Sequence, residues 1–266
     1  MNEKIWKILS NKNKVDNPQL QQKLNIDNVL CNLLNLREVT NYEIAEKFFR
    51  PSLNELHDPF LMLGMDKAIQ RIEDALTNNE RILIFGDYDV DGTTAVSIVY
   101  SYFKNFTNKI EYYIPDRYKE GYGISLKAID YASENNIKLI IALDCGIKAI
   151  EKIKYANSKN VNFIICDHHL PGETIPDAFA VLDPKQLQCN YPYKELSGAG
   201  IGFKLIQAYA IKNNLPIETC YDYLDLVVTS IAADIVPLTG ENRILAYYGL
   251  DKIKKQPRPA FKALLN

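Results

Sequence analysis

The sequence predicts an α/β fold, in which a parallel sheet is flanked by helices. Four short apolar runs alternate with amphipathic stretches, and this alternation of strand and helix is typical of parallel sheets. The runs lie at residues 82–85, 110–114, 137–143 and 161–166, and the stretches lie at 93–104, 125–135 and 147–159. Nearly continuous apolar strands indicate burial on both faces of the sheet. The 266 residues, 47% of them hydrophobic, are enough for one large domain or two ordinary ones.

Residues 1–64 are expected to form a helical and irregular N-terminal extension. A short helix is predicted after Thr40 or Asn41, either of which can cap it, and it should stop before Pro51. From Met65 onward the apolar residues recur at helical spacing. We therefore expect the main domain to begin there and to span residues 65–240.

The C-terminal part of the chain is again predicted to be helical, at 199–213, 219–233 and 241–255. The final stretch, KKQPRPAFKALLN, has two prolines in a basic segment and starts a new apolar helix at Ala260. We expect residues 241–266 to be a connecting helix and the start of a linker to an absent C-terminal domain.

Composition restricts the possible partners and the cellular compartment. The net charge is −2 and the isoelectric point about 6.0, so a polyanionic ligand would need a local basic patch or bound cations. The five cysteines include no C-x-x-C pair and are interpreted as reduced thiols. No apolar stretch is long enough to span a bilayer, and the N-terminus lacks a secretory signal. A cytoplasmic protein with no membrane partner is expected.

Acidic residues and histidines follow three of the predicted strands and one predicted helix. They are Asp87, Asp89 and Asp91 in FGDYDVDG, Asp144 in LDCGI, Asp167, His168 and His169 in CDHH, and Asp234 in SIAADIVPL. Ligands of open parallel sheets bind beyond the carboxyl ends of the strands. These side chains are therefore expected to share one crevice.

Such a carboxylate-rich site with an added imidazole suits Mn²⁺ or Mg²⁺, and five or six acids are enough for two ions. Bound cations would also relieve the repulsion among the clustered aspartates. The alternative is that Asp87 or Asp89 only caps the following helix. Residues 167–169 taken alone are also compatible with a solvated turn.

The motifs FGDYDVDGTTA, LDCGI, CDHH and ADIVPL resemble those of the DHH phosphoesterase superfamily, most closely its RecJ-type single-strand-specific exonucleases. The segments IPDRYKEGYGIS and LSGAGIGFKL also resemble that family. The resemblance covers roughly residues 50 to 266. It implies a 5′-to-3′ exonuclease that hydrolyses single-stranded DNA in repair and recombination and depends on Mn²⁺ or Mg²⁺.

Carried over to this sequence, the resemblance implies a role for each matching residue. The metal ligands would be Asp87, Asp89, Asp91, Asp144, His168 and Asp234. Asp144 would bridge the two ions, Asp167 would orient the histidines, and His169 would contact the scissile phosphate. Longer relatives continue into a DHHA1 domain and an OB-like domain, so this chain alone is expected to be weakly active.

Three further residues are candidates for substrate binding. Arg117 and Lys119 lie in the loop after the second strand, where they would hold a DNA phosphate or be ordinary solvated charges. Tyr122 would stack on a base or belong to the core. The Gly-rich segment 197–204 opens a helix, whose amides would bind a phosphate or allow close helix packing.

Two other functions remain open for such a sequence. One is a DHH phosphodiesterase or pyrophosphatase that acts on small nucleotides or pyrophosphate. The other is a non-catalytic DHH scaffold that binds partner proteins. The aspartate-first motif argues against the former, and the complete set of expected ligands argues against the latter.

Overall fold

The computed structural model describes residues 18–265, which divide into two compact units between Asn54 and Glu55. The first 17 residues of the expected extension lie outside the described part. The larger unit begins ten residues before the expected boundary, because residues 55–64 pack with it. There the backbone N–H of Leu63 donates to the Cys189 sulfur at 3.4 Å.

The smaller unit is helical, as expected. It contains α1 (Pro18–Leu24), α2 (Asn28–Asn35) and α3 (Tyr42–Phe49) around a core that includes Leu20, Cys31 and Ala45. Asn41 caps α3, since its side chain accepts a hydrogen bond from the backbone N–H of Ile44 at 2.8 Å. Of the two caps considered, Asn41 is thus the one used.

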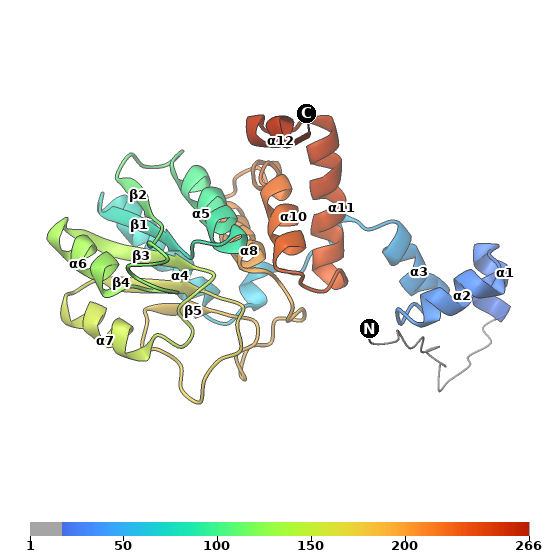
Figure 1. Cartoon of the computed structure of the whole chain (residues 1–266), viewed down its shortest axis with the longest axis horizontal. Coiled ribbons are helices and arrows are strands. Elements are labelled where there is room, and N and C mark those ends of the chain that lie inside the picture. Colours follow the sequence, from blue (N-terminus) through green and yellow to red (C-terminus); the bar gives the residue numbers. More distant parts are fainter. Residues whose placement is uncertain (1–17, 266) are drawn as a thin grey trace, which may run out of the picture. The chain divides into compact units, whose positions relative to one another are not determined.

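A five-stranded sheet, parallel throughout, forms the centre of the larger unit (Figure 1). The strands are β1 (Arg81–Gly86), β2 (Ile110–Tyr113), β3 (Ile137–Leu143), β4 (Asn162–Cys166) and β5 (Ala180–Leu182), in the order β2-β1-β3-β4-β5. The four expected strands are confirmed. The three residues of β5 were not predicted, because so short an apolar run gives no periodic signal.

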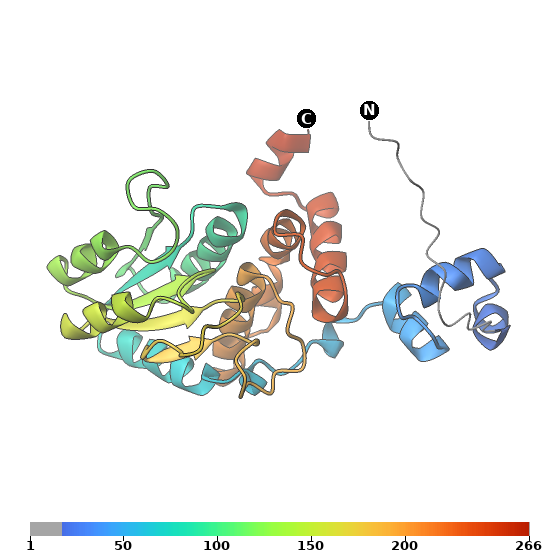
Figure 2. The same ribbon diagram turned by 60° about the horizontal axis from the view of Figure 1, so that its bottom comes forward.

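Helices cover both faces of this sheet. The helices of the larger unit are α4 (Met65–Thr77), α5 (Val90–Phe103), α6 (Leu126–Glu134), α7 (Ile150–Ser158), α8 (Gly198–Lys212), α9 (Glu218–Tyr221), α10 (Leu224–Ala233), α11 (Gly240–Lys255) and α12 (Pro259–Leu265). One face carries α6 and α7, and the other carries α4, α5 and α8, as Figures 1 and 2 show. Outside that layer, α10 packs on α5 and α8, and α11 packs on α10.

Two helices differ in extent from the expected ones. The single helix expected at 219–233 is divided into α9 and α10, and Arg258 binds the carbonyl oxygen of Asp222 at the break. The helix expected from 147 starts only at Ile150, because Gly146 has a φ of 116° and the chain makes a turn there.

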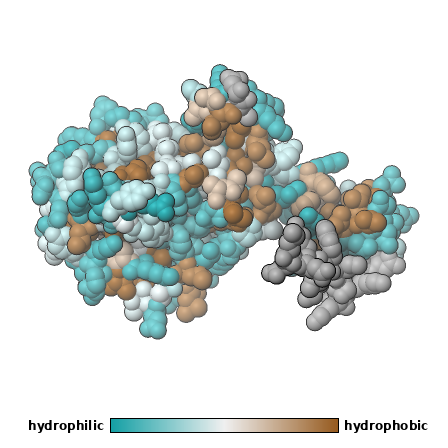
Figure 3. Space-filling model, viewed as in Figure 1, coloured by the Kyte–Doolittle hydropathy of each residue, from teal (hydrophilic) through white to brown (hydrophobic). Residues whose placement is uncertain are grey.

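Three further observations concern the helices, the surface and the cysteines. Within residues 18–265, no helix combines the length and the apolar character needed to cross a membrane. Hydrophobic side chains collect over the C-terminal helices in the view of Figure 3. In α11 and α12, the side chains of Tyr247, Leu250 and Leu264 are half or more exposed. All five cysteines are buried, and none of them forms a disulfide.

The strand order determines where a site can lie. The chain leaves β1 toward β2 on one side and leaves β3 toward β4 on the other. The carboxyl ends of β1 and β3 therefore flank a crevice of the kind in which open α/β sheets bind ligands.

Candidate metal centre and acid–base pair

The structure brings the predicted acids and histidines together at the carboxyl edge of the sheet. Two groups of side chains have potential ligand atoms within 4.8 Å of one another. One group is Asp91, His168 and Asp234, and the other is Asp144, His168 and His169. His168 belongs to both groups, so it lies at the centre of the candidate site.

The imidazole of His168 is surrounded by carboxylates. Its Nε2 lies 3.1 Å from Asp144 Oδ1, 3.5 Å from Asp91 Oδ2 and 3.6 Å from Asp234 Oδ2. Nevertheless both ring nitrogens of His168 and Asp144 Oδ1 are buried without a hydrogen-bond partner among the described residues. Buried polar atoms are rarely left unsatisfied. Oxygen and nitrogen atoms that face each other in this way fit a shared divalent cation.

Asp144 occupies a constrained position at the end of β3. Its φ is 58°, in the left-handed region that aspartate tolerates better than most residues. A β-carbon added to Gly198 would lie 2.7 Å from the Asp144 β-carbon, so only glycine allows α8 to approach this closely. Burial, followed by repulsion from Asp91 and Asp89, raises the pKa of Asp144. A bound cation would replace the protons that such a carboxyl group otherwise takes up.

Asp91 has a structural role that the sequence did not suggest. Its Oδ2 accepts a hydrogen bond from the Gly198 N–H, and its Oδ1 accepts from the Ala199 N–H and the Ser230 hydroxyl, each at 2.7 Å. The first amides of α8 would otherwise lack partners. The Gly-rich segment is therefore used for close packing and for anchoring Asp91, and these two amides are already occupied by a carboxylate.

The other two aspartates of the first motif lie outside both groups. Asp87 is buried, and its Oδ1 is 3.4 Å from the Gly123 N–H while its Oδ2 has no partner among the described residues. Burial raises the pKa of Asp87. Asp89 is exposed and caps α5 by accepting from the Gly92 N–H at 2.9 Å, as the capping alternative anticipated. Both remain predicted ligands rather than members of the observed groups.

Asp234 reaches the site from the C-terminal end of α10, where its backbone N–H donates to the Ser230 carbonyl at 2.9 Å. It is an exposed residue at the mouth of the crevice. Burial of the carboxyl group nevertheless raises the pKa of Asp234, and the neighbouring Asp91 and Asp89 add to the effect while the histidines oppose it.

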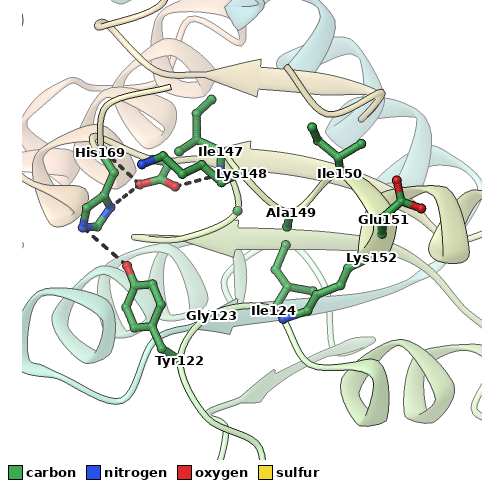
Figure 4. Close-up of a pocket in the computed structure, with 12 residues that line it drawn as sticks. Tyr122, Gly123, Ile124, Ile147, Lys148, Ala149, Ile150, Glu151, Lys152 and His169 are labelled. Carbon is green, nitrogen blue, oxygen red and sulfur yellow. Dashed lines mark hydrogen bonds and ion pairs between the residues drawn. The ribbon is translucent and has the colours of Figure 1, made fainter. Parts of the chain in front are cut away.

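A second functional unit is the pair formed by Asp167 and His169 (Figure 4). Asp167 Oδ1 accepts from His169 Nδ1 at 2.7 Å, and Asp167 Oδ2 accepts from the Ile147 N–H at 2.9 Å. Because a carboxylate only accepts, the Nδ1 of His169 carries the proton. Burial opposes the charge on Asp167, yet these hydrogen bonds lower the pKa of Asp167, and the same hydrogen bond raises the pKa of His169.

The orientation expected from Asp167 applies to one imidazole only. Asp167 also accepts from the backbone N–H groups of His168 and His169, at 2.8 and 3.2 Å. The side-chain bond, however, is made to His169 alone. The Nε2 of His169 faces the crevice, where it forms a long hydrogen bond of 3.4 Å with the Tyr122 hydroxyl.

The candidate substrate residues lie at different distances from this centre. Tyr122 is beside His169 and 54% exposed, so it is not a core residue. Arg117 is exposed, and its guanidinium lies over the Tyr88 ring, 5.3 Å from the centroid, beside the first motif. Lys119 is exposed, and its ammonium lies 3.9 Å from Asp116.

Sequence reasoning missed one carboxylate at this edge of the sheet. Asp183 follows β5 and is fully buried, with one oxygen bound to the Lys185 N–H at 2.7 Å and the other without a partner among the described residues. Burial raises the pKa of Asp183 to about 7. The sequence AVLDPK carries the signal, an apolar run followed by an aspartate, but the run is too short to be recognised as a strand.

Comparison with known proteins identifies relatives of this chain. Residues 81–231 match the family model described as "DHH family, N-terminal domain". The single-stranded-DNA-specific exonuclease RecJ of Bacillus subtilis (strain 168) is 39% identical over 246 residues, which is 92% of this chain and 30% of that protein. The chain spans about a third of the length of the curated relatives it matches most strongly.

Two solved structures are also similar. A crystal structure of exonuclease RecJ bound to manganese superimposes with a TM-score of 0.71 at 31% identity, covering 80% of this chain and 53% of that one. The structure of RecJ from Thermus thermophilus in complex with Mn²⁺ gives a TM-score of 0.77 at 26% identity, covering 93% of this chain and 34% of that one.

Proposed function

Because this chain belongs to the DHH family, we propose that it is the catalytic part of a hydrolase that degrades single-stranded DNA from the 5′ end. The relatives described above are named as single-stranded-DNA-specific exonucleases. The observation that carries the proposal is the placement of the buried His168 cluster next to the Asp167–His169 pair. A metal site beside a positioned acid suits phosphodiester hydrolysis, and we place this activity in DNA repair and recombination.

We assign the cation site to the chain's own side chains. Asp91, Asp144, His168 and Asp234 would hold two divalent ions, Mn²⁺ or Mg²⁺, with further oxygens from Asp87 and Asp89. The fit rests on the unsatisfied, buried atoms of His168 and Asp144 and on the oxygen-rich set with one imidazole, which tilts the preference toward Mn²⁺. When bound, two such ions would neutralise phosphate charge and lower the pKa of the attacking water.

The residues of the chain supply the positioning and the proton. Asp167 holds the Nδ1–H of His169 and favours its protonated form, so the Nε2 of His169 can donate a proton toward the crevice. In the proposed reaction His169 contacts the scissile phosphate and gives this proton to the leaving 3′ oxygen as the P–O bond breaks. Tyr122 lies beside that nitrogen, and Arg117 is the candidate cation for a neighbouring phosphate.

Further partners belong to the same proposal. The DHHA1 and OB-like domains implied by the family resemblance would form the opposite wall of the DNA groove. With a net charge of −2, this chain has little diffuse attraction for a polyanion, so DNA affinity is proposed to depend on that wall. Five buried cysteines without a disulfide support a reducing compartment such as the cytoplasm.

The test is cleavage of a 5′-labelled single-stranded oligonucleotide with enzyme in excess and Mn²⁺ present. Asp144→Ala should abolish cleavage, whereas Asp251→Ala, which removes an exposed acid that pairs with Lys255, should not. Pyrophosphate and cyclic dinucleotides serve as comparison substrates. Normal cleavage by Asp144→Ala would refute the assignment of Asp144 to the metal site. Faster turnover of the small substrates than of the oligonucleotide would indicate a small-molecule phosphodiesterase instead of a nuclease.

A further inference from the structure

A pocket of about 580 Å³ lies beside His169 and is not explained by the metal chemistry (Figure 4). One wall is the loop that follows β2, and the other is the segment between β3 and the start of α7. Its residues 146–152 belong to neither ligand group. The volume falls within the range of pockets that bind small molecules.

The backbone turn at Gly146 creates one wall of this pocket. Because the Ala149 N–H donates to the Gly146 carbonyl at 2.9 Å, residues 147–149 form a turn instead of the first turn of α7. Together with Ile124 and Ile150, this turn gives the pocket a mostly apolar lining. The Tyr122 ring stands at the end nearest His169, as Figure 4 shows.

The unpaired charges around the pocket are positive. Lys148 and Lys152 line it, and neither forms an ion pair with any residue in the described range 18–265. Glu151 pairs with Lys154 at 2.8 Å instead. Asp167, at the other end, is already engaged by His169 and by the Ile147 amide. A ligand with an apolar, flat body and a negative charge fits such a lining.

We propose that this pocket binds one nucleotide of the DNA strand, adjacent to the phosphate that His169 contacts, an inference that rests on the function proposed above. The isoleucines would contact the sugar and the base faces, and the Tyr122 ring would cover the base. Lys148 and Lys152 would offset the charge of a flanking phosphate. Apolar walls and long lysines offer no fixed pattern of donors and acceptors, so binding would be independent of base identity.

The experiment uses the 266-residue chain in EDTA, labelled with ¹³C at isoleucine methyl groups, and NMR titrations with three probes. Thymidine 5′-monophosphate should shift the methyl signals of Ile124, Ile147 and Ile150 in a saturable manner. Thymidine should bind about tenfold more weakly because it lacks the phosphate, and inorganic phosphate should leave the three signals unshifted.

Lysine variants test the role of charge, and Lys154, which lies on α7 as Lys152 does, provides a matched control. Replacing both Lys148 and Lys152 by alanine should weaken binding of thymidine 5′-monophosphate about tenfold, to the level of thymidine. Lys154→Ala should leave that affinity unchanged, because Lys154 faces Glu151 and does not line the pocket. Equal losses in the two variants would overturn the proposed contact.

The outcomes separate this inference from the nuclease function. If thymidine 5′-monophosphate shifts none of the three isoleucines, or if phosphate alone shifts them equally, the nucleotide pocket is refuted. Mn²⁺-dependent cleavage with no such binding would leave the nuclease function standing and discard the pocket. Nucleotide binding in EDTA without any Mn²⁺-dependent cleavage would support the pocket and discard the nuclease function.

Discussion

The contrast between Asp91 and Asp144 yields a prediction about stability in the absence of metal. Both are buried acids beside His168, but Asp91 accepts three hydrogen bonds whereas Asp144 Oδ1 accepts none from residues 18–265. Asp91→Asn places an amide NH₂ opposite at least one N–H of α8. Asp144→Asn removes the cost of neutralising a buried carboxyl group whose pKa is raised, gives up no side-chain hydrogen bond to residues 18–265, and keeps a residue that tolerates the left-handed backbone. We expect the two substitutions to change stability in opposite directions.

The magnitude follows from the contacts. Leaving one buried donor unpaired costs roughly 1–3 kcal/mol, and removing the negative charge from the α8 N-terminus costs about 1 kcal/mol more. Without the charge of Asp91 the carboxyl group of Asp144 is less costly to bury, which returns about 1 kcal/mol. Asp91→Asn should therefore lower the free energy of unfolding by about 2 kcal/mol, or roughly 4–8 °C in melting temperature. Asp144→Asn should raise it by about 1 kcal/mol, since a buried carboxyl group no longer has to take up a proton on folding.

Urea unfolding followed by circular dichroism in EDTA measures both variants. Mn²⁺ titration of the same samples should show that Asp144→Asn, although more stable without metal, loses the ion's stabilising effect. A loss of stability of similar size in both variants would refute the reasoning, because it would mean that Asp144 has partners in the metal-free protein.

Three other outcomes are expected. Mn²⁺ at a thousand times its dissociation constant should stabilise the protein by about 4 kcal/mol. His168→Ala should remove most of this gain, as calorimetry can measure. An undiminished gain in the variant would contradict the role of His168 as a ligand shared by both groups. The hydrogen bond to Asp167 should keep the pKa of His169 above the value of a free imidazole. The protonated His169 therefore stabilises the folded protein fully below the pKa of the unfolded state, and this contribution is lost as the pH rises through the pKa of the folded state. Asp167→Asn should lower the pKa of His169, which ¹⁵N NMR can follow. An unchanged titration curve of His169 in this variant would argue against the pair. Gly198→Ala should destabilise the fold far more than Gly172→Ala, because the added β-carbon meets a neighbouring carbon at 2.7 Å in the first case and its nearest neighbour at 3.7 Å in the second; equal denaturation midpoints would show that α8 can shift.

The sequence predicted the parts of the structure that have a strong periodic signal. The long strands and most helices of the α/β unit were found because apolar runs and amphipathic stretches alternate over many residues. The edge strand β5 and the break between α9 and α10 were missed, because three apolar residues give no period and the break depends on the distant Arg258.

The sequence predicted which residues gather at the candidate site, but it did not predict their hydrogen-bond partners. Strand-end positions were sufficient to place Asp144 and His168 in one crevice. They did not reveal that Asp89 caps α5 or that Asp91 binds α8, because these contacts depend on how the helices pack. Asp183 was missed together with the strand that carries it.

The hydrogen bonds of Asp91 to α8 and α10 affect how the sequences of divergent relatives should be interpreted. A lineage that lost the proposed hydrolysis could replace Asp144 or Asp234 by drift, since neither side chain satisfies a helix terminus among the described residues. Loss of Asp91 would leave the Gly198 and Ala199 amides without their partner inside the protein, although the Ser230 hydroxyl would keep Ser197 Oγ, so selection for folding alone would preserve the aspartate. An aspartate retained at this position is therefore a marker of the architecture, whereas one retained at position 144 is a marker of the chemistry.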